Sequence, residues 1–230
     1  MPAALLLAKL TVYAAASLTN VFPQIDSSPQ YSFGASNTLA AQIQLGAPAD
    51  VFASANLALP LQLFQKGVCT QPVVFTRNAL VLIVPKSNPA GIRSVYDLQK
   101  QGVKVDVAAP GVPVGSYTRQ ILKNMALTNV LSNVVSNETD VREVLAKVAL
   151  GEADAGFVYS TDANTVPGQV SVLRMPAWAQ PKVQYGICIV RSSPNAAAAE
   201  AFVRRVLSKA GQAKLVAAGF LPRVKPKTAP

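Results

Sequence analysis

Histidine is absent from this chain of 230 residues. Its absence removes the commonest general base, the commonest metal ligand and the Ser-His-Asp arrangement of many hydrolases. Cysteine is scarce as well: Cys69 and Cys188 form no CxxC motif, which argues against a zinc site. The sequence leaves two states open for these thiols, a disulfide in an oxidising compartment or two unpaired buried side chains.

Long apolar runs and charged residues are also few. No run reaches the roughly 18–20 apolar residues that a membrane-spanning helix needs, and the apolar stretch "PAALLLA" at 2–8 is short. That stretch fits the remnant of a signal peptide, a chain end or the approach to a first strand. Charged residues make up 14% of the chain and hydrophobic residues 50%, a composition that excludes a disordered chain and supplies a sizeable core.

Basic residues outnumber acidic ones, and the formal net charge is +10. This balance suits a nucleic acid, an anionic membrane surface or a small anionic ligand. The lysines and arginines are scattered, apart from a group near the C-terminus (Arg223, Lys225 and Lys227), and no nucleic-acid-binding motif accompanies them. We therefore expect a solvated basic surface that attracts anions weakly, and no nucleic-acid partner.

Strand-like runs alternate with helical patterns along the chain, including helices expected over 19–25 and 141–150. In the second of these, Val141, Val144 and Val148 recur on one face at helical spacing. The alternation predicts an α/β protein in which mainly parallel sheets are covered by helices.

Two long strands, expected at 79–84 and 183–190, frame the middle of the chain. The segment between them is long enough to form a second lobe. We expect a discontinuous first lobe of residues 1–82 and 184–230 and an inserted second lobe of residues 83–183. The two adjacent connections would form a hinge, with the ligand site in the cleft between the lobes.

Four joints between a strand and a helix carry small or uncharged residues. They read "YAAASLTN", "FGASNTLAAQI", "AAPGVPVGSYTRQ" and "SNETDVREVL", and they contain Ser17, Ser36, Val114 and Val141. Backbone N–H groups at a helix start favour anions, and small residues allow a ligand to approach the backbone closely. Ligands of α/β sheets bind at the carboxyl ends of strands, so we expect two joints on each side of the cleft.

Each of these residues also has an ordinary explanation when taken singly. A serine at a helix start is most often an N-cap. Val114 alone is typical of a loop, Val141 of a core and Tyr159 of a strand end, and Thr139 or Asp140 can cap the helix that follows. The set of four joints, and no single one, indicates an anion site.

The joints and their flanks resemble the periplasmic molybdate-binding proteins of ABC transporters, a family with the two-lobed type II solute-binding fold. The segments that carry the resemblance are "VYAAASLTN", "FGASNTLAAQIQLGAPADVFASAN", "VPVGSYTRQIL", "TDVREVLAKVALGEADAGFVYSTDA" and "AAGF", in the family's order. They extend over nearly the whole chain. One departure is "VFPQIDSSPQYSF", which is shorter than the family usually has between its first two joints, so we expect a clipped first helix or a tight connection.

The resemblance implies an oxyanion site made only of hydrogen-bond donors. Ser17 and Ser36 would each offer a backbone N–H and a hydroxyl, Val114 and Val141 a backbone N–H, and Tyr159 its hydroxyl. The ligand would be molybdate or tungstate. There would be no cofactor and no direct bond from protein to metal, since the molybdenum is bound as an oxyanion.

The resemblance also implies a place and a partner. The chain would be a monomeric binding protein in the periplasm or on the outer face of the cell envelope, after removal of a signal sequence. Its lobes would close on the anion, and it would deliver the anion to a membrane ABC permease.

Other functions stay open on the residues alone. Sulfate or another small tetrahedral oxyanion has a similar shape, and only cavity size separates sulfate from molybdate. A hydrolase that used Ser17 or Ser36 would need a base, and without histidine the lysine closest to Ser17 in sequence is Lys9. A regulatory sensor of the same fold would usually carry a helix-turn-helix segment, which we do not expect before residue 9. We therefore expect a binding protein and not an enzyme.

Overall fold

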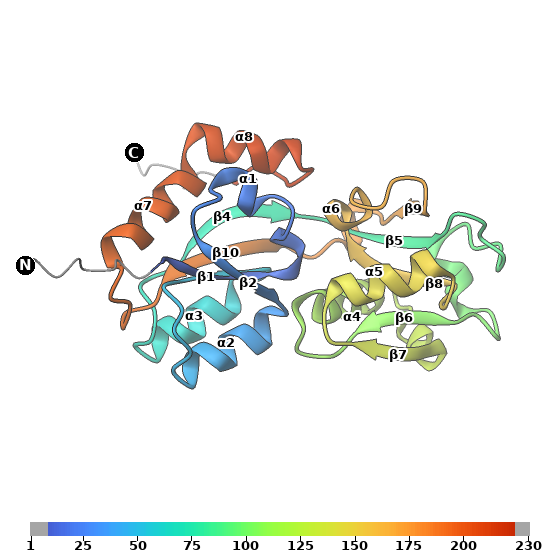
Figure 1. Cartoon of the computed structure of the whole chain (residues 1–230). Coiled ribbons are helices and arrows are strands. Elements are labelled where there is room, and N and C mark those ends of the chain that lie inside the picture. Colours follow the sequence, from blue (N-terminus) through green and yellow to red (C-terminus); the bar gives the residue numbers. More distant parts are fainter. Residues whose placement is uncertain (1–8, 224–230) are drawn as a thin grey trace, which may run out of the picture.

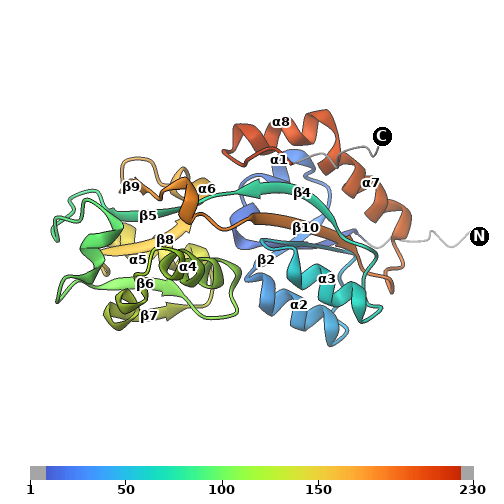
Figure 2. The ribbon, with the colours of Figure 1, turned by 180° about the vertical axis from the view of Figure 1, so that it is seen from behind.

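The computed structural model describes residues 9–223 and contains two five-stranded sheets. The strand order is β2-β1-β3-β10-β4 in the first sheet and β7-β6-β8-β5-β9 in the second. Helices flank both sheets, and each sheet with its helices forms one lobe (Figures 1 and 2). None of the helices formed by residues 9–223 has the length and apolar character needed to cross a membrane. The predicted two-lobed α/β architecture is confirmed.

The first lobe contains both ends of the described chain. Its strands are β1 (Thr11–Ala15), β2 (Gln30–Gly34), β3 (Val51–Ser54), β4 (Val73–Asn78) and β10 (Val183–Ile189). Its helices are the 3-10 turn η1 (Ala16–Leu18), α1 (Phe22–Ile25), α2 (Ser36–Gln44), α3 (Ala58–Gln65), α7 (Ala196–Leu207) and α8 (Lys209–Ala217). Strand β1 pairs in parallel with β2 and β3, whereas β10 runs antiparallel to β3 and β4. Only β10 therefore opposes the common strand direction.

The second lobe repeats this arrangement. Its strands are β5 (Leu80–Pro85), β6 (Val105–Ala108), β7 (Val134–Glu138), β8 (Ala155–Tyr159) and β9 (Val170–Arg174). Its helices are α4 (Pro113–Asn124), α5 (Val141–Leu150), α6 (Ser160–Ala163) and the 3-10 turns η2 (Val95–Gln99), η3 (Thr128–Asn133) and η4 (Ala177–Ala179). Strand β6 pairs in parallel with β7 and β8, and β5 is antiparallel to β8 and β9. Each lobe is thus a mainly parallel, mixed sheet.

The lobes are joined by two connections that lie close together in Figure 1. One is Ala79, between β4 of the first sheet and β5 of the second, and the other leads from β9 back to β10. Strand β5 pairs with β8 and β9 from Leu80 onward, so residues 80–82 lie in the second sheet although we assigned them to the first lobe. Val183 begins β10 of the first sheet. The exact lobe limits stay a prediction.

The helix expected over 19–25 is wrong in its first half. The structure has a 3-10 turn, Ala16–Leu18, and then a four-residue helix, Phe22–Ile25. Pro23 explains the difference, because in a helix beginning at 19 its ring would clash with the carbonyl of the residue four positions earlier. A short helix in the segment after the first joint agrees with the clipped helix that we expected.

Cys69 and Cys188 are both buried free thiols. They belong to a small apolar cluster beneath α2 and α3, together with Leu39, Ile43 and Leu63. Contact with Cys69 and burial raise the pKa of the Cys188 thiol, which keeps it neutral. Of the two states left open by the sequence, the structure has the unpaired one.

Candidate functional site

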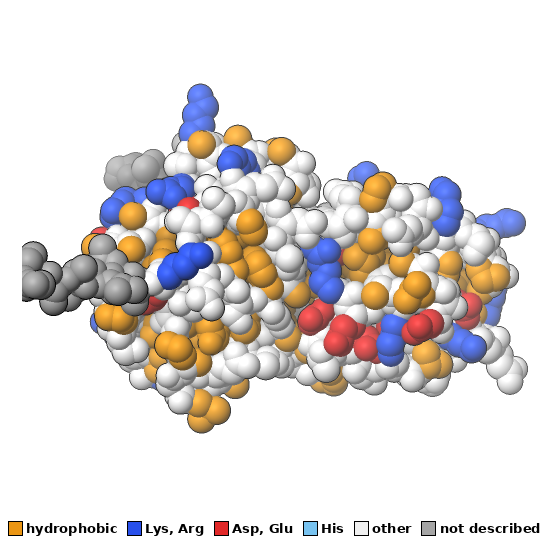
Figure 3. Space-filling model, viewed as in Figure 1, with side chains coloured by type: hydrophobic (Ala, Val, Ile, Leu, Met, Phe, Trp, Pro, Cys, Tyr) orange, Lys and Arg blue, Asp and Glu red, His pale blue; other side chains and the backbone are white. Residues whose placement is uncertain are grey.

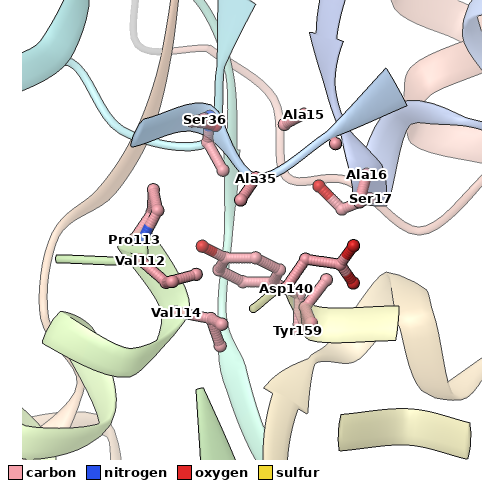
Figure 4. Close-up of a pocket in the computed structure, with 13 residues that line it drawn as sticks. Ala15, Ala16, Ser17, Ala35, Ser36, Val112, Pro113, Val114, Asp140 and Tyr159 are labelled. Atoms are coloured by element: carbon pink, nitrogen blue, oxygen red, sulfur yellow. Dashed lines mark hydrogen bonds between the residues drawn. The ribbon is translucent and has the colours of Figure 1, made fainter. Parts of the chain in front are cut away.

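A small cavity lies between the two lobes, where the carboxyl ends of the parallel strands meet (Figure 4). Measured as the space that the centre of a water molecule can occupy, the cavity volume is about 20 Å³. A single water needs at least about 10–15 Å³ by this measure, so the space suits a compact ligand and not a typical organic one. All five predicted residues line the cavity: Ser17, Ser36, Val114, Val141 and Tyr159.

Small residues form much of the first lobe's wall. The lining includes Ala15, Ala16, Gly34, Ala35 and Ala55. A methyl group or a hydrogen atom on the α-carbon leaves the neighbouring backbone N–H groups accessible. Ala15 at the end of β1 and Ala16 after it therefore provide clearance, as we predicted for this joint.

The hydroxyls of the two serines are not helix caps. Ser36 is the first residue of α2, and its Oγ accepts the backbone N–H of Ala55 at 3.0 Å. The Ser17 Oγ lies 2.8 Å from the Tyr185 hydroxyl. Neither η1 nor α2 has a side-chain cap. The capping explanation is therefore wrong for both serines.

The bonding of each serine leaves a proton free for a ligand. Because Ser36 accepts from Ala55, its own hydroxyl hydrogen is available to the cavity. Asn78 Nδ2 lies 3.5 Å from the Tyr185 hydroxyl oxygen, so Tyr185 can accept from Asn78 and donate to Ser17. In that orientation Ser17 also keeps a hydrogen to donate.

Replacing Ser36 by alanine is expected to weaken anion binding by about 1–3 kcal/mol, through the loss of one hydroxyl donor. The same change leaves the buried Ala55 N–H without its acceptor, so we also expect a loss of stability of about 1–3 kcal/mol. Titration calorimetry and urea unfolding measure the two effects. Ser132→Ala is the matched control, since this exposed hydroxyl also makes one backbone bond. Unchanged affinity in Ser36→Ala would remove this hydroxyl from the site.

Two helices of the second lobe direct backbone donors at the cavity. Val114 is the second residue of α4, after Pro113 at the first position, and α4 has no side-chain cap. Gly115 lets the start of α4 lie close to the end of β6, because a Cβ at this position would lie 2.3 Å from the carbonyl oxygens of Ala108 and Ala109. The first N–H groups of a helix have no intrahelical acceptor, so the Val114 N–H is open to a ligand.

Helix α5 leaves one donor uncapped. The Asp140 Oδ1 accepts the N–H groups of Arg142 at 2.6 Å and Glu143 at 3.2 Å. The Asp140 side chain does not accept the N–H of Val141, the first residue of the helix. Val141 therefore lines the cavity with an N–H that Asp140 does not cap, and the prediction of Asp140 as a possible capping residue is confirmed.

Tyr159 presents a hydroxyl that the protein does not satisfy. The residue is 1% exposed, and its hydroxyl oxygen has no hydrogen-bond partner among residues 9–223. Its ring packs edge-on against Tyr185, with the centroids 5.6 Å apart, and points into the cavity (Figure 4). Burial raises the pKa of Tyr159 well above its usual value. The hydroxyl therefore stays protonated and needs an acceptor.

The cavity wall has one acidic residue and, among the described residues that line it, no lysine or arginine. That acidic residue is Asp140, so the wall is not made only of donors. In Figure 4 its carboxylate points away from the Tyr159 hydroxyl, and its Oδ1 is occupied by the first turn of α5. Elsewhere on the molecule, lysine and arginine side chains are scattered over both lobes (Figure 3). The positive charge thus lies on the surface and not in the site.

Lys9 cannot act as a base for Ser17. Lys9 precedes β1 and Ser17 follows it, and a strand rises about 3.3 Å per residue, so roughly 20 Å separates them. Tyr185 is the neighbour of Ser17 that sequence reasoning missed, since the two residues are 168 positions apart. A tyrosine within the buried run "VQYGICI" gives no local sign of this contact.

Comparisons with known proteins identify the family and the fold of the chain. The model of the family described as bacterial extracellular solute-binding protein matches residues 10–221. The molybdate-binding protein ModA of Mycobacterium tuberculosis is 38% identical over 221 residues, covering 92% of this chain and 84% of that protein.

Two solved structures have the same fold. The periplasmic molybdate-binding protein of Azotobacter vinelandii has a TM-score of 0.83 at 25% identity, covering 94% of this chain and 100% of that one. The sulfate-binding protein SubI of Mycobacterium tuberculosis has a TM-score of 0.80 at 20% identity, covering 93% and 86%.

Proposed function

The chain belongs to the bacterial extracellular solute-binding proteins, in the group of the molybdate-binding proteins of ABC transporters, and we propose from this premise that it captures molybdate. The observation that carries the proposal is the cavity between the lobes, where uncapped backbone N–H groups and the unpaired Tyr159 hydroxyl converge. In this proposal Ser17, Ser36, Val114, Val141 and Tyr159 hold the anion.

The donor set suits an anion that carries no proton. Molybdate is a fully deprotonated tetrahedral dianion at neutral pH, so it accepts hydrogen bonds and donates none. Backbone N–H groups and hydroxyls supply donors in several directions. A phosphate that carries a proton would need an acceptor. The one carboxylate of the wall, Asp140, uses its Oδ1 to cap α5 and points away from the Tyr159 hydroxyl, and a donor left unpaired in the cavity costs about 1–3 kcal/mol. The proposal therefore favours molybdate and tungstate over protonated phosphate.

Binding does not require a positively charged side chain. Burying an ion costs several kcal/mol per charge, and each hydrogen bond to a charged group contributes about 1.5–3 kcal/mol. Donors from five residues offset the cost, and the helix starts at α2, α4 and α5 add about 0.3–1 kcal/mol each. A cavity without lysine or arginine also favours release of the anion when the lobes separate.

The division of the donors between two lobes suggests how binding works. Ser17 and Ser36 belong to the first lobe and the other three residues to the second. An anion that contacts both sets stabilises the arrangement in which the lobes meet, because it has its full set of donors only there. We propose that lobe closure captures the anion and that the monomeric protein delivers it, outside the cytoplasm, to an ABC permease.

A thermal-shift panel of molybdate, tungstate, sulfate and phosphate tests the proposal. A ligand at 100 times its dissociation constant adds about 2.7 kcal/mol of stability. We expect large shifts with molybdate and tungstate and none with phosphate. A shift with sulfate alone would replace molybdate by the alternative ligand, and no shift with any oxyanion would contradict the proposed function.

A further inference from the structure

Arg142 follows the proposed ligand residue Val141, and its side chain joins three segments. The Nη1 donates to Thr165 Oγ1 at 3.0 Å, and the Nε forms an ion pair with Asp162 Oδ1 at 3.2 Å. The Nη2 donates to Asn20 Oδ1 at 3.3 Å. Thr165 and Asp162 belong to the second lobe, whereas Asn20 follows η1 in the first lobe. The guanidinium therefore spans the cleft beside the cavity.

Asp162 lies directly behind the site. It is fully buried, and its Oδ2 accepts the backbone N–H of Tyr159 at 3.3 Å. Thr165 in turn donates its hydroxyl to the Asp162 carbonyl at 2.7 Å. One buried carboxylate thus contacts the residue that supplies the hydroxyl donor and the residue next to Val141. Val141 follows β7 and Tyr159 ends β8. The ion pair between Arg142 and Asp162 therefore holds these two proposed donors in place relative to each other.

The contact between the lobes lies at the edge of a water-accessible groove. The groove has a volume of about 520 Å³ and is lined by Thr19 and Asn20 of the first lobe and by Arg142, Leu145 and Thr165 of the second. Helix α5 and the turn η1 are in contact here. Separation of the lobes would break the bond between Arg142 and Asn20 and leave the contacts to Thr165 and Asp162 intact.

We propose that Arg142 is a positioning residue that ties the second lobe's anion donors to the first lobe and slows release of the bound anion. The inference rests on the proposed function. A bond that exists only when the lobes meet stabilises that arrangement, and it acts mainly on the dissociation rate because the lobes approach before it forms. Arg142 suits the role because its planar guanidinium donates to Thr165 and Asn20 and at the same time forms an ion pair with Asp162.

Asn20→Ala is the sharpest variant, since it removes only the acceptor on the first lobe. Asn20 is exposed, so folding should be unaffected. We expect molybdate to dissociate about 3 to 10 times faster, with an unchanged association rate and an unchanged melting temperature without ligand. Asn129→Ala, which also removes one exposed side-chain bond, is the matched control. Release of radiolabelled molybdate into excess unlabelled molybdate gives the dissociation rate.

Arg142→Gln and the double variant complete the test. Arg142→Gln leaves the buried Asp162 carboxylate without its partner, so this variant is expected to lose stability as well as to release the anion faster. Arg204→Gln is the control for the lost charge, since Arg204 is an exposed, ion-paired arginine of α7. We expect the double variant to release molybdate no faster than Arg142→Gln alone. Wild-type release in Asn20→Ala, or additive effects in the double variant, would overturn the inference. Absence of molybdate binding by the wild-type protein would instead defeat the proposed function.

Discussion

Replacing Tyr159 by phenylalanine is expected to weaken molybdate binding roughly tenfold to a hundredfold and to leave the ligand-free protein at least as stable as the wild type. The two effects have opposite signs because the hydroxyl is buried without a partner. In the free protein an unsatisfied buried hydroxyl costs about 1–3 kcal/mol. In the complex it would donate to the anion, and a hydrogen bond to a charged group contributes about 1.5–3 kcal/mol.

Titration calorimetry with molybdate and urea unfolding without ligand measure these effects. Tyr96→Phe is the matched control, because Tyr96 is 53% exposed and lies outside the cavity. Wild-type affinity in Tyr159→Phe would show that the hydroxyl does not contact the anion. A large loss of stability in the free protein would show that the hydroxyl is already satisfied there.

Replacing Val141 by proline is expected to weaken molybdate binding by about 1.5–3 kcal/mol through the loss of one backbone donor. Proline is well tolerated at the first position of a helix, where its fixed φ suits the turn. The preceding residue, Asp140, is extended, with φ −151° and ψ 177°, as a residue before proline must be. The cap to Arg142 and Glu143 remains, so α5 should form as in the wild type.

Val141→Ala separates the donor from the side chain. It keeps the N–H and loses buried volume, so we expect it to lower stability and to retain most of the affinity. Both variants are compared by calorimetry, with the helical content checked by circular dichroism. Equal losses of affinity in the two variants would assign the effect to packing and would contradict a backbone donor at this position.

The parts of the fold with a strong local signal were predictable. Helix α5 occupies the expected range 141–150, since its apolar face and its Asp140 cap agree. Strands β4 and β7 were missed. Each has polar residues in its second half that weaken the apolar signal: β4 reads "VVFTRN" and β7 "VVSNE".

The site was predictable for a different reason. Four of the five candidate residues came from joints that resemble a known family and Tyr159 from another segment of the same resemblance. The structure places all five around one cavity, and that they hold an anion stays a prediction. The residues that support them were not found, because each contact joins distant parts of the chain. Tyr185 meets Ser17 only when β10 has joined the first sheet, and Asn20 meets Arg142 only when the two lobes meet. No local sequence pattern indicates such contacts.

A crystal structure of the protein with molybdate, with the molybdenum located by its anomalous scattering, tests the account most directly. We predict one anion in the cavity, with its oxygens within hydrogen-bond distance of the backbone N–H groups of Ser17, Ser36, Val114 and Val141 and of the Ser17, Ser36 and Tyr159 hydroxyls. We predict no lysine or arginine side chain in contact with it. Molybdenum outside the cavity, or an anion held by a lysine or arginine side chain, would contradict the account.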